Sequence, residues 1–153
     1  MKRVKLIVAY DGTNYCGWQI QPNGITIEQV LNENLSKLLG EEITVTGASR
    51  TDSGVHSMGN VAIFDTETRM PADKISFALN QRLPEDIVVQ DSCEVPSDWH
   101  PRYQDVSKTY EYHVIHTRIP DPTRRLTNYF VSYPLDIEQC EKRRPTWKEL
   151  MIS

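Results

Sequence analysis

Apolar residues along the chain follow two kinds of spacing, one typical of strands and the other of helices. Residues 4–10 are almost entirely apolar and end at the turn Asp11-Gly12, which predicts a strand in the middle of a sheet. Shorter apolar stretches bounded by turn residues predict further strands at 43–47, 61–64, 87–94, 109–116 and 128–133.

Two stretches instead have the three- and four-residue spacing of amphipathic helices. Thr26 and Gln29 have the separation of a capping box, and the stripe that follows them ends at Gly40. Pro71 suits the first turn of a second helix, which ends before Pro84. The two apolar stripes consist of Ile27, Val30, Leu31, Leu35, Leu38 and Leu39, and of Ile75, Ala78, Leu79 and Leu83. Both stripes predict core packing and no chemistry.

The elements follow the order strand, helix, strand, strand, helix, strand. This order predicts an α+β fold in which an antiparallel-leaning mixed sheet carries two helices on one face, as in ferredoxin-like and RRM domains. A chain of 153 residues makes one such domain or slightly more, and its 39% hydrophobic and 25% charged residues are typical of a globular protein.

Composition also bounds the compartment and the cofactors. No apolar run reaches the roughly 18 residues of a membrane span and no signal-peptide pattern opens the chain, so we expect a cytoplasmic protein. Cys16, Cys93 and Cys140 are odd in number and widely spaced, which predicts reduced thiols. His113 and His116 would point to opposite faces of a strand, so we expect no metal site.

A polar loop between two predicted strands, at residues 48–57, carries the main candidate chemistry. It places Arg50 two residues before Asp52 among small residues, an arrangement that can hold one carboxylate out into a cleft. Taken alone, an aspartate in a Ser/Thr/Gly-rich turn more often accepts hydrogen bonds from its own backbone.

The net charge of -4 argues against RNA binding, because Lys and Arg supply much of the affinity for phosphates. That objection weakens if basic residues gather on one surface, or belong to a part of the protein outside this chain. The candidates for such a surface are Arg50, Arg102, Lys108, Arg118, Arg124 and Arg125.

Aromatic residues after the first strand leave two interpretations open. Tyr15, Gly17 and Trp18 lie in a predicted loop, where the two rings would either pack under the rim of the sheet or stack on RNA bases.

Four segments of the chain match, in order, the motifs of one protein family. Residues 48–57 (ASRTDSGVHS) resemble the signature GRTDxGVHA of the TruA family of tRNA pseudouridine synthases, with Ala48-Ser49 where Ala-Gly is more common. Residues 10–19 (YDGTNYCGWQ) resemble YDGTxYxGWQ, residues 99–103 (WHPRY) resemble FHARF, and residues 108–112 (KTYEY) resemble KxYxY. Four ordered matches are far more specific than any single motif.

This resemblance implies both a reaction and a larger architecture. Members of the family break the C1'–N1 glycosidic bond of a uridine in RNA, turn the base and rejoin it through C5, without a cofactor. The implied substrate is the anticodon stem-loop of tRNA, with uridines at positions 38, 39 and 40, and the implied assembly is a homodimer. The implied fold joins two α+β halves through one continuous sheet, and this chain contains the first half.

The resemblance also assigns candidate roles to residues of the matched motifs. Asp52 is the expected catalytic carboxylate, acting as a nucleophile or stabilising charge that develops on the sugar. Arg50 would keep that acid ionised, or grip a phosphate in the space left by a flipped nucleotide. Tyr110 matches a pocket tyrosine that would stack on the uracil or help to remove the C5 proton. Arg102 and His100 resemble RNA-contacting positions, although either side chain could instead bind backbone carbonyls.

The end of the chain departs from this pattern. Asp136 and Gln139 have the spacing of a helix cap, yet no apolar stripe follows and Pro145 ends a charged run. One interpretation is a solvated basic tail. The other is a shifted reading frame: back-translated from the last base of the Gln139 codon, residues 140–153 can spell MRKAAADLEGTHDF, which resembles the family's next segment. We therefore divide the chain into an N-terminal half with the catalytic loop, 1–139, and an aberrant tail, 140–153. Resequencing the gene across the Gln139 codon tests this division.

Three functions are compatible with these observations: an isomerase of tRNA uridines, an RNA-binding module without turnover, and a non-functional fragment. Asp52 favours the isomerase, because binding alone needs no such acid. The incomplete match to the family favours the other two.

Overall fold

The computed structural model describes residues 1–103, 112–132 and 150–152 of the chain. The chain divides into two compact units, a first unit of Met1–Gln104 and a second unit of Asp105–Ser153. The boundary predicted after Gln139 lies between described segments and stays a prediction.

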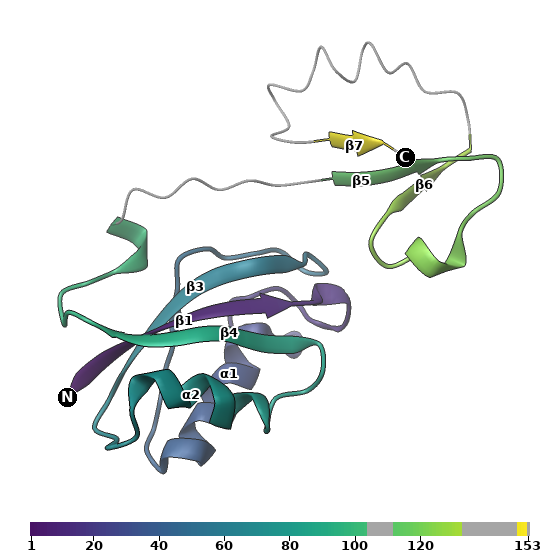
Figure 1. The fold of residues 1–153 in the computed structure, drawn as a ribbon. Coiled ribbons are helices and arrows are strands. Elements are labelled where there is room, and N and C mark those ends of the chain that lie inside the picture. Colours follow the sequence, from purple (N-terminus) through teal and green to yellow (C-terminus); the bar gives the residue numbers. More distant parts are fainter. Residues whose placement is uncertain (104–111, 133–149, 153) are drawn as a thin grey trace. The chain divides into compact units, whose positions relative to one another are not determined.

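The first unit is an antiparallel sheet with two helices on one face (Figure 1). Its elements are β1 (Lys2–Tyr10), η1 (Gly12–Asn14), α1 (Ile27–Leu39), β2 (Thr46–Gly47), β3 (Ser57–Thr66), α2 (Ala72–Asn80), β4 (Ile87–Val95) and η2 (Pro101–Tyr103). The strand order is β2-β3-β1-β4, so each crossover through a helix skips one strand. This arrangement is the split βαβ topology of ferredoxin-like folds, and it confirms the predicted α+β class.

Strand β1 lies in the middle of this sheet, as its apolar composition predicts. It pairs antiparallel with β3, where Lys2 faces Thr66, and with β4, where Arg3 faces Val95. The residues of β1 that point to the helices are buried, and those between them are partly exposed. The buried set is Val4, Leu6, Val8 and Tyr10.

Helix α1 begins and ends at the predicted residues. The Thr26 hydroxyl accepts the Gln29 backbone N–H at 3.3 Å, and Gly40 takes the left-handed conformation with φ of +68° at the C-cap. Only half of the predicted capping box forms, because the Gln29 side chain donates to Glu33 at 3.3 Å instead of returning to the cap.

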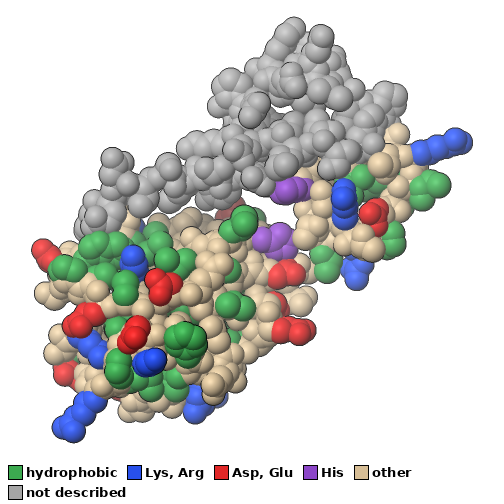
Figure 2. All heavy atoms as spheres, in the orientation of Figure 1, with side chains coloured by type: hydrophobic (Ala, Val, Ile, Leu, Met, Phe, Trp, Pro, Cys, Tyr) green, Lys and Arg blue, Asp and Glu red, His purple; other side chains and the backbone are tan. Residues whose placement is uncertain are grey.

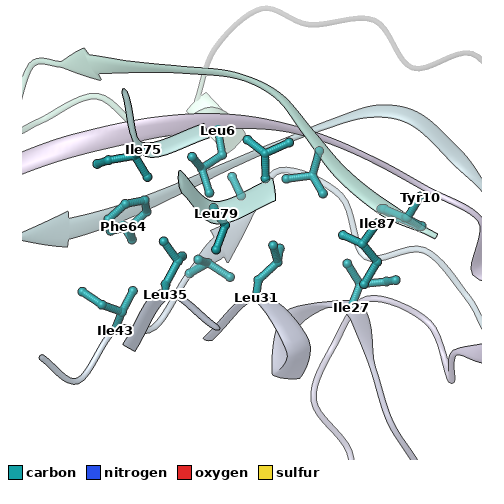
Figure 3. Packing of buried hydrophobic residues seen from close by; sticks show 14 of the residues in the cluster. Leu6, Tyr10, Ile27, Leu31, Leu35, Ile43, Phe64, Ile75, Leu79 and Ile87 are labelled. Atoms are coloured by element: carbon teal, nitrogen blue, oxygen red, sulfur yellow. The ribbon is translucent and has the colours of Figure 1, made fainter. Parts of the chain in front are cut away.

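The core of the first unit fills the space between the sheet and the two helices (Figure 3). It combines the inward residues of the strands with the stripes predicted for the helices. Its fully buried members include Leu6, Val4, Val8, Ile27, Leu31, Leu35, Ile75, Leu79, Ile87 and Val89. Each such side chain contributes about 1.5–3 kcal/mol of transfer free energy, so this layer dominates the stability of the unit.

The strand predicted at 43–47 is shorter than expected, since only Thr46–Gly47 pairs with β3. Ile43 and Val45 are buried, but their backbone N–H groups donate to side chains of α1. The acceptors are the Ser36 hydroxyl at 3.0 Å and the Asn32 amide oxygen at 2.8 Å. The apolar pattern therefore indicated burial correctly, while the hydrogen bonds went to the helix and not to a neighbouring strand.

The second unit has a small parallel sheet of its own. Its described elements are β5 (Tyr112–His116), η3 (Pro122–Arg124), β6 (Tyr129–Val131) and β7 (Leu150–Ile152), in the sheet order β6-β5-β7. The pairing of β6 with β5 confirms that the segment near 128–133 lies beside the preceding strand. Val114 and Ile115, which are consecutive in β5, are both buried.

No helix in the described parts of either unit combines the length and the apolar character that a membrane crossing requires.

Candidate active site

Asp52 lies in the connection between β2 and β3, here called the Asp52 loop (residues 48–57). Its side chain is exposed, and its backbone carbonyl accepts the Val55 N–H at 3.1 Å to close a turn. Gly54 has a φ of +79°, which a glycine adopts without strain. Asp52 is therefore an exposed residue in a turn that its own backbone carbonyl closes.

The preceding motif, residues 11–18, packs its backbone against the Asp52 loop and is here called the backing segment. The Trp18 N–H donates to the Thr51 carbonyl at 3.0 Å, and the Gly54 N–H donates to the Tyr15 carbonyl at 3.2 Å. The Ser53 hydroxyl donates to the same Tyr15 carbonyl at 3.3 Å. Three hydrogen bonds thus join Thr51, Ser53 and Gly54, on either side of Asp52, to the backing segment.

Two glycines of the backing segment make this close approach possible. A Cβ atom on Gly12 would lie 2.1 Å from the Val55 carbonyl oxygen, and one on Gly17 would lie 2.5 Å from the Thr51 carbonyl oxygen. Gly17 also has a φ of +79°. This backing role was not predicted from the sequence, because contacts between segments so far apart do not affect the local spacing of apolar residues.

The aromatic residues of the backing segment pack inside the protein. Trp18 is 1% exposed and Tyr15 is 8% exposed, which decides for packing and against base stacking. The Trp18 ring lies 6.0 Å from that of Tyr10, centroid to centroid. The Tyr10 hydroxyl lies 2.6 Å from the Thr51 hydroxyl, so the end of β1 also contacts the residue before Asp52.

Tyr15 ties the backing segment to the start of β4. Its hydroxyl donates to the Asp86 carboxylate at 2.6 Å, while the Asp86 carbonyl accepts the Asp11 N–H at 2.9 Å. Burial, followed by the hydrogen bond to Asp86 and the charge of that carboxylate, raises the pKa of Tyr15. This hydroxyl therefore stays protonated and acts as a structural donor.

His56 contacts the backing segment from the far end of the Asp52 loop. Its Nδ1 atom lies 3.0 Å from the Gly12 nitrogen and 3.1 Å from Asp11 Oδ1. The pKa of Asp11 is lowered, chiefly because the Thr13 hydroxyl and backbone N–H donate to its carboxylate, with a smaller effect from His56.

Two arginines of the matched motifs act on one carboxylate near the start of α1. Burial raises the pKa of Glu28, and the charges of Arg50 and Arg102 oppose that rise. Arg102 is exposed in η2, and its Nε donates to the Gly47 carbonyl at 3.2 Å. Arg50 is exposed in the Asp52 loop itself. The structure thus brings Arg50 and Arg102 to the neighbourhood of the same side chain.

Of the other two residues singled out in the later motifs, His100 lies in the described part of the chain and Tyr110 does not. The His100 ring accepts the Arg102 backbone N–H through Nδ1 at 3.1 Å, so it caps η2. Tyr110 lies outside the described residues, and its predicted contact with the base stays a prediction.

Fold and site together define a class: an α+β protein that presents one exposed carboxylate on a loop whose backbone is held by a second, glycine-rich segment. A family model described as tRNA pseudouridine synthase matches residues 6–104. The chain therefore belongs to the tRNA pseudouridine synthase family.

Known relatives agree with this assignment. "tRNA pseudouridine synthase A" of Thermoanaerobacter sp. (strain X514) is 45% identical over 142 residues, which cover 93% of this chain and 58% of the relative. The proteins of the same name from Geotalea daltonii and Acetivibrio thermocellus are each 44% identical, over 90% and 93% of this chain. Those matches cover 57% and 58% of the relatives, so the chain spans less than two thirds of their length.

Proposed function

We propose that this chain is the part of a tRNA pseudouridine synthase that carries the catalytic acid, and that the enzyme isomerises uridines at positions 38, 39 and 40 of the anticodon stem-loop. The observation that supports this most is the exposed carboxylate of Asp52 on a loop fixed from behind by hydrogen bonds at Thr51, Ser53 and Gly54. A rigidly held reacting group lowers the barrier by removing the entropy of alignment.

The proposed reaction needs an acid in its charged form. Cleavage of the C1'–N1 bond leaves electron deficiency on the sugar, which the Asp52 carboxylate neutralises by covalent attack or by its charge. The freed uracil turns and C5 bonds to C1', which breaks the Asp52–C1' bond if one has formed and returns the carboxylate. The proton on C5 then leaves and N1 ends with a proton. Atoms and electrons balance without a cofactor, so the reaction is an isomerisation.

A stacked uridine must leave its helix to reach Asp52, at a cost of a few kcal/mol. Arg50 stands in the same loop, two residues away, and Arg102 is exposed in η2. In the proposed complex these two guanidiniums hold the phosphates beside the flipped nucleotide, and Tyr110 stacks on the base.

The second unit offers a further surface for RNA. Arg118, Arg124 and Arg125 are exposed there, and Asp121 pairs with Arg124 at 3.9 Å. Figure 2 shows basic side chains, all of them arginines, standing out from the described part of this unit, with hydrophobic side chains between them. Such clusters bind phosphates by releasing counterions, which supports local RNA binding by a chain of net charge -4.

The proposed setting is the cytoplasm, where tRNA is modified, and the proposed assembly is a homodimer. The alternative is an RNA-binding fragment without turnover. It is favoured by one observation, namely that the chain covers 58% of its relative from Thermoanaerobacter.

The test is release of tritium from tRNA labelled at C5 of uridine, with the 153-residue chain and with a chain in which the proposed frame is restored. We expect turnover in the restored chain, and its loss in Asp52→Ala with tRNA binding largely intact. Asp73→Ala is the matched control, because Asp73 is exposed in the first turn of α2. Equal turnover in the Asp52→Ala variant would remove Asp52 from the mechanism.

An assay of the 153-residue chain distinguishes the isomerase from the RNA-binding fragment. We expect this chain to bind tRNA with little or no release of tritium. Strong turnover by the short chain would instead show that the catalytic machinery is complete within it.

A further inference from the structure

We propose that His56 is the positioning residue for Asp52, and that it holds the Asp52 loop against the backing segment only while its Nδ1 atom is unprotonated. This inference rests on the proposed function in one respect, the assignment of Asp52 as the reacting acid. The observation behind it is that His56 Nδ1 lies next to one hydrogen-bond donor and one hydrogen-bond acceptor.

The two neighbours of His56 Nδ1 are a donor and an acceptor at nearly the same distance. The Gly12 backbone N–H, at 3.0 Å, can only donate, so it requires a lone pair on Nδ1. The Asp11 carboxylate, at 3.1 Å, can only accept once ionised, so it requires a proton on Nδ1. One nitrogen cannot satisfy both, and each protonation state of the imidazole therefore favours one neighbour.

The neutral imidazole satisfies the buried Gly12 donor, and Asp11 has other donors. Its Nδ1 accepts from Gly12, while Asp11 Oδ1 already accepts the Thr13 backbone N–H at 3.0 Å and the Thr13 hydroxyl at 2.5 Å. The pKa of Asp11 is lowered by these bonds, so this carboxylate is ionised and does not need the histidine.

The protonated imidazole leaves one group without a partner. Nδ1–H would turn to Asp11, and the Gly12 N–H would then face another N–H. Gly12 is buried, and its Cα is so close to Val55 that an added Cβ would come within 2.1 Å of the Val55 carbonyl oxygen. A buried donor facing a donor is unfavourable, so protonation pushes the two backbones apart.

Further ionisable groups in the described part of the chain lie on the backing segment and just before β4. Tyr15 and Asp86 form the hydrogen-bonded pair next to Asp11, and the Asp86 carbonyl holds the Asp11 N–H. These contacts anchor the Asp11 side of the cluster, so movement on protonation falls on the His56 side. That side is the Asp52 loop, four residues beyond the acid.

Two substitutions separate the Nδ1 contact from the rest of the side chain. In His56→Asn the amide oxygen, bonded to Cγ, takes nearly the place of Nδ1 and accepts from Gly12 at every pH. In His56→Gln the amide sits one carbon further out, near the place of Nε2, and leaves Gly12 without an acceptor. The two variants are similar in polarity and neither titrates, so they form a matched pair.

The test is NMR spectroscopy of the 15N-labelled 153-residue chain over a pH series. We expect an unprotonated Nδ1 in the neutral imidazole, and amide shifts of Gly12, Asp52 and Gly54 that follow the titration of His56. In His56→Asn these shifts should be flat and the Gly12 amide should stay protected from hydrogen exchange. In His56→Gln the Gly12 amide should lose that protection. A His100→Gln variant should leave the titration of the Asp52 loop unchanged.

Three results would overturn the inference. They are a proton on Nδ1 of the neutral ring, equal hydrogen-exchange protection of the Gly12 amide in the Asn and Gln variants, or an Asp52 amide shift that does not change as His56 titrates. If one variant does not fold, the wild-type chain still decides the first and the third of these outcomes, and either of them overturns the inference. Tritium release with the same substitutions made in the frame-restored chain tests the proposed function separately. Absence of turnover in all of them would count against that function and would leave the NMR result unchanged.

Discussion

Gly17→Ala is the sharpest test of how the Asp52 loop is held. Gly17 has a φ of +79°, and an added Cβ would lie 2.5 Å from the Thr51 carbonyl oxygen, where ordinary contact begins at 3.4 Å. The Thr51 carbonyl is the acceptor for the Trp18 N–H, so it cannot retreat without breaking that bond. The clash therefore has to move the backbone next to Asp52 by about 0.9 Å, the difference between those two distances.

Gly40→Ala provides a control that separates the clash from backbone strain. Gly40 has a φ of +68°, and no atom lies within 4 Å of its added Cβ. Both substitutions pay the cost of a left-handed alanine, about 1–2 kcal/mol. Only Gly17→Ala also displaces the Thr51 carbonyl.

We expect urea unfolding to show a larger loss of stability for Gly17→Ala than for Gly40→Ala. Amide exchange should show a loss of protection at Trp18 in Gly17→Ala and normal protection there in Gly40→Ala. In a chain that turns over tRNA, Gly17→Ala should lower tritium release by about 100-fold, since a misplacement of about 1 Å has that effect on a reacting group. Equal unfolding free energies and intact Trp18 protection in both variants would refute the backing role.

Two further predictions concern stability. Glu28→Gln should raise the unfolding free energy at neutral pH, because burial raises the folded-state pKa of Glu28 above its unfolded value. This gain in unfolding free energy should decrease as the pH falls from the raised folded-state pKa to the unfolded-state pKa. Urea titrations at several pH values would show the decrease. A gain that persists in acid would rule out ionisation as its cause. Leu31→Ala should cost about 2–5 kcal/mol, because Leu31 is fully buried, while Leu38→Ala on the same helix should cost less since Leu38 is partly exposed. Similar losses in the two leucine variants would contradict the burial pattern.

Local pattern was enough to predict the framework of the first unit. The apolar run of β1 and the capped stripe from Thr26 to Gly40 each depend on residues a few positions apart, so their elements could be predicted from sequence. The strand predicted at 43–47 was wrong in part. Burial of Ile43 and Val45 does not determine whether a neighbouring strand or a helix side chain accepts their backbone N–H groups.

The candidate site could be predicted only in part. Asp52 and its exposure on a loop were expected from the motif, although its catalytic role remains a proposal. The roles of Gly12, Gly17 and His56 were not predicted, because they arise where residues 11–18 meet residues 48–57 and depend on backbone distances. Glycines that recur in a matched motif were the available signal, and a close backbone contact is one of the few reasons a chain needs them.

The position of β1 has a consequence for how the protein is made. Within this unit the central strand is synthesised before both of its partners, which end at Thr66 and Val95. Neither edge of β1 can be covered until those later strands emerge, so the nascent chain carries an apolar strand unpaired for most of the synthesis of this unit. Closure of the sheet is then a late, long-range event, and the pairing of β1 with β3 brings the Asp52 loop next to its backing segment.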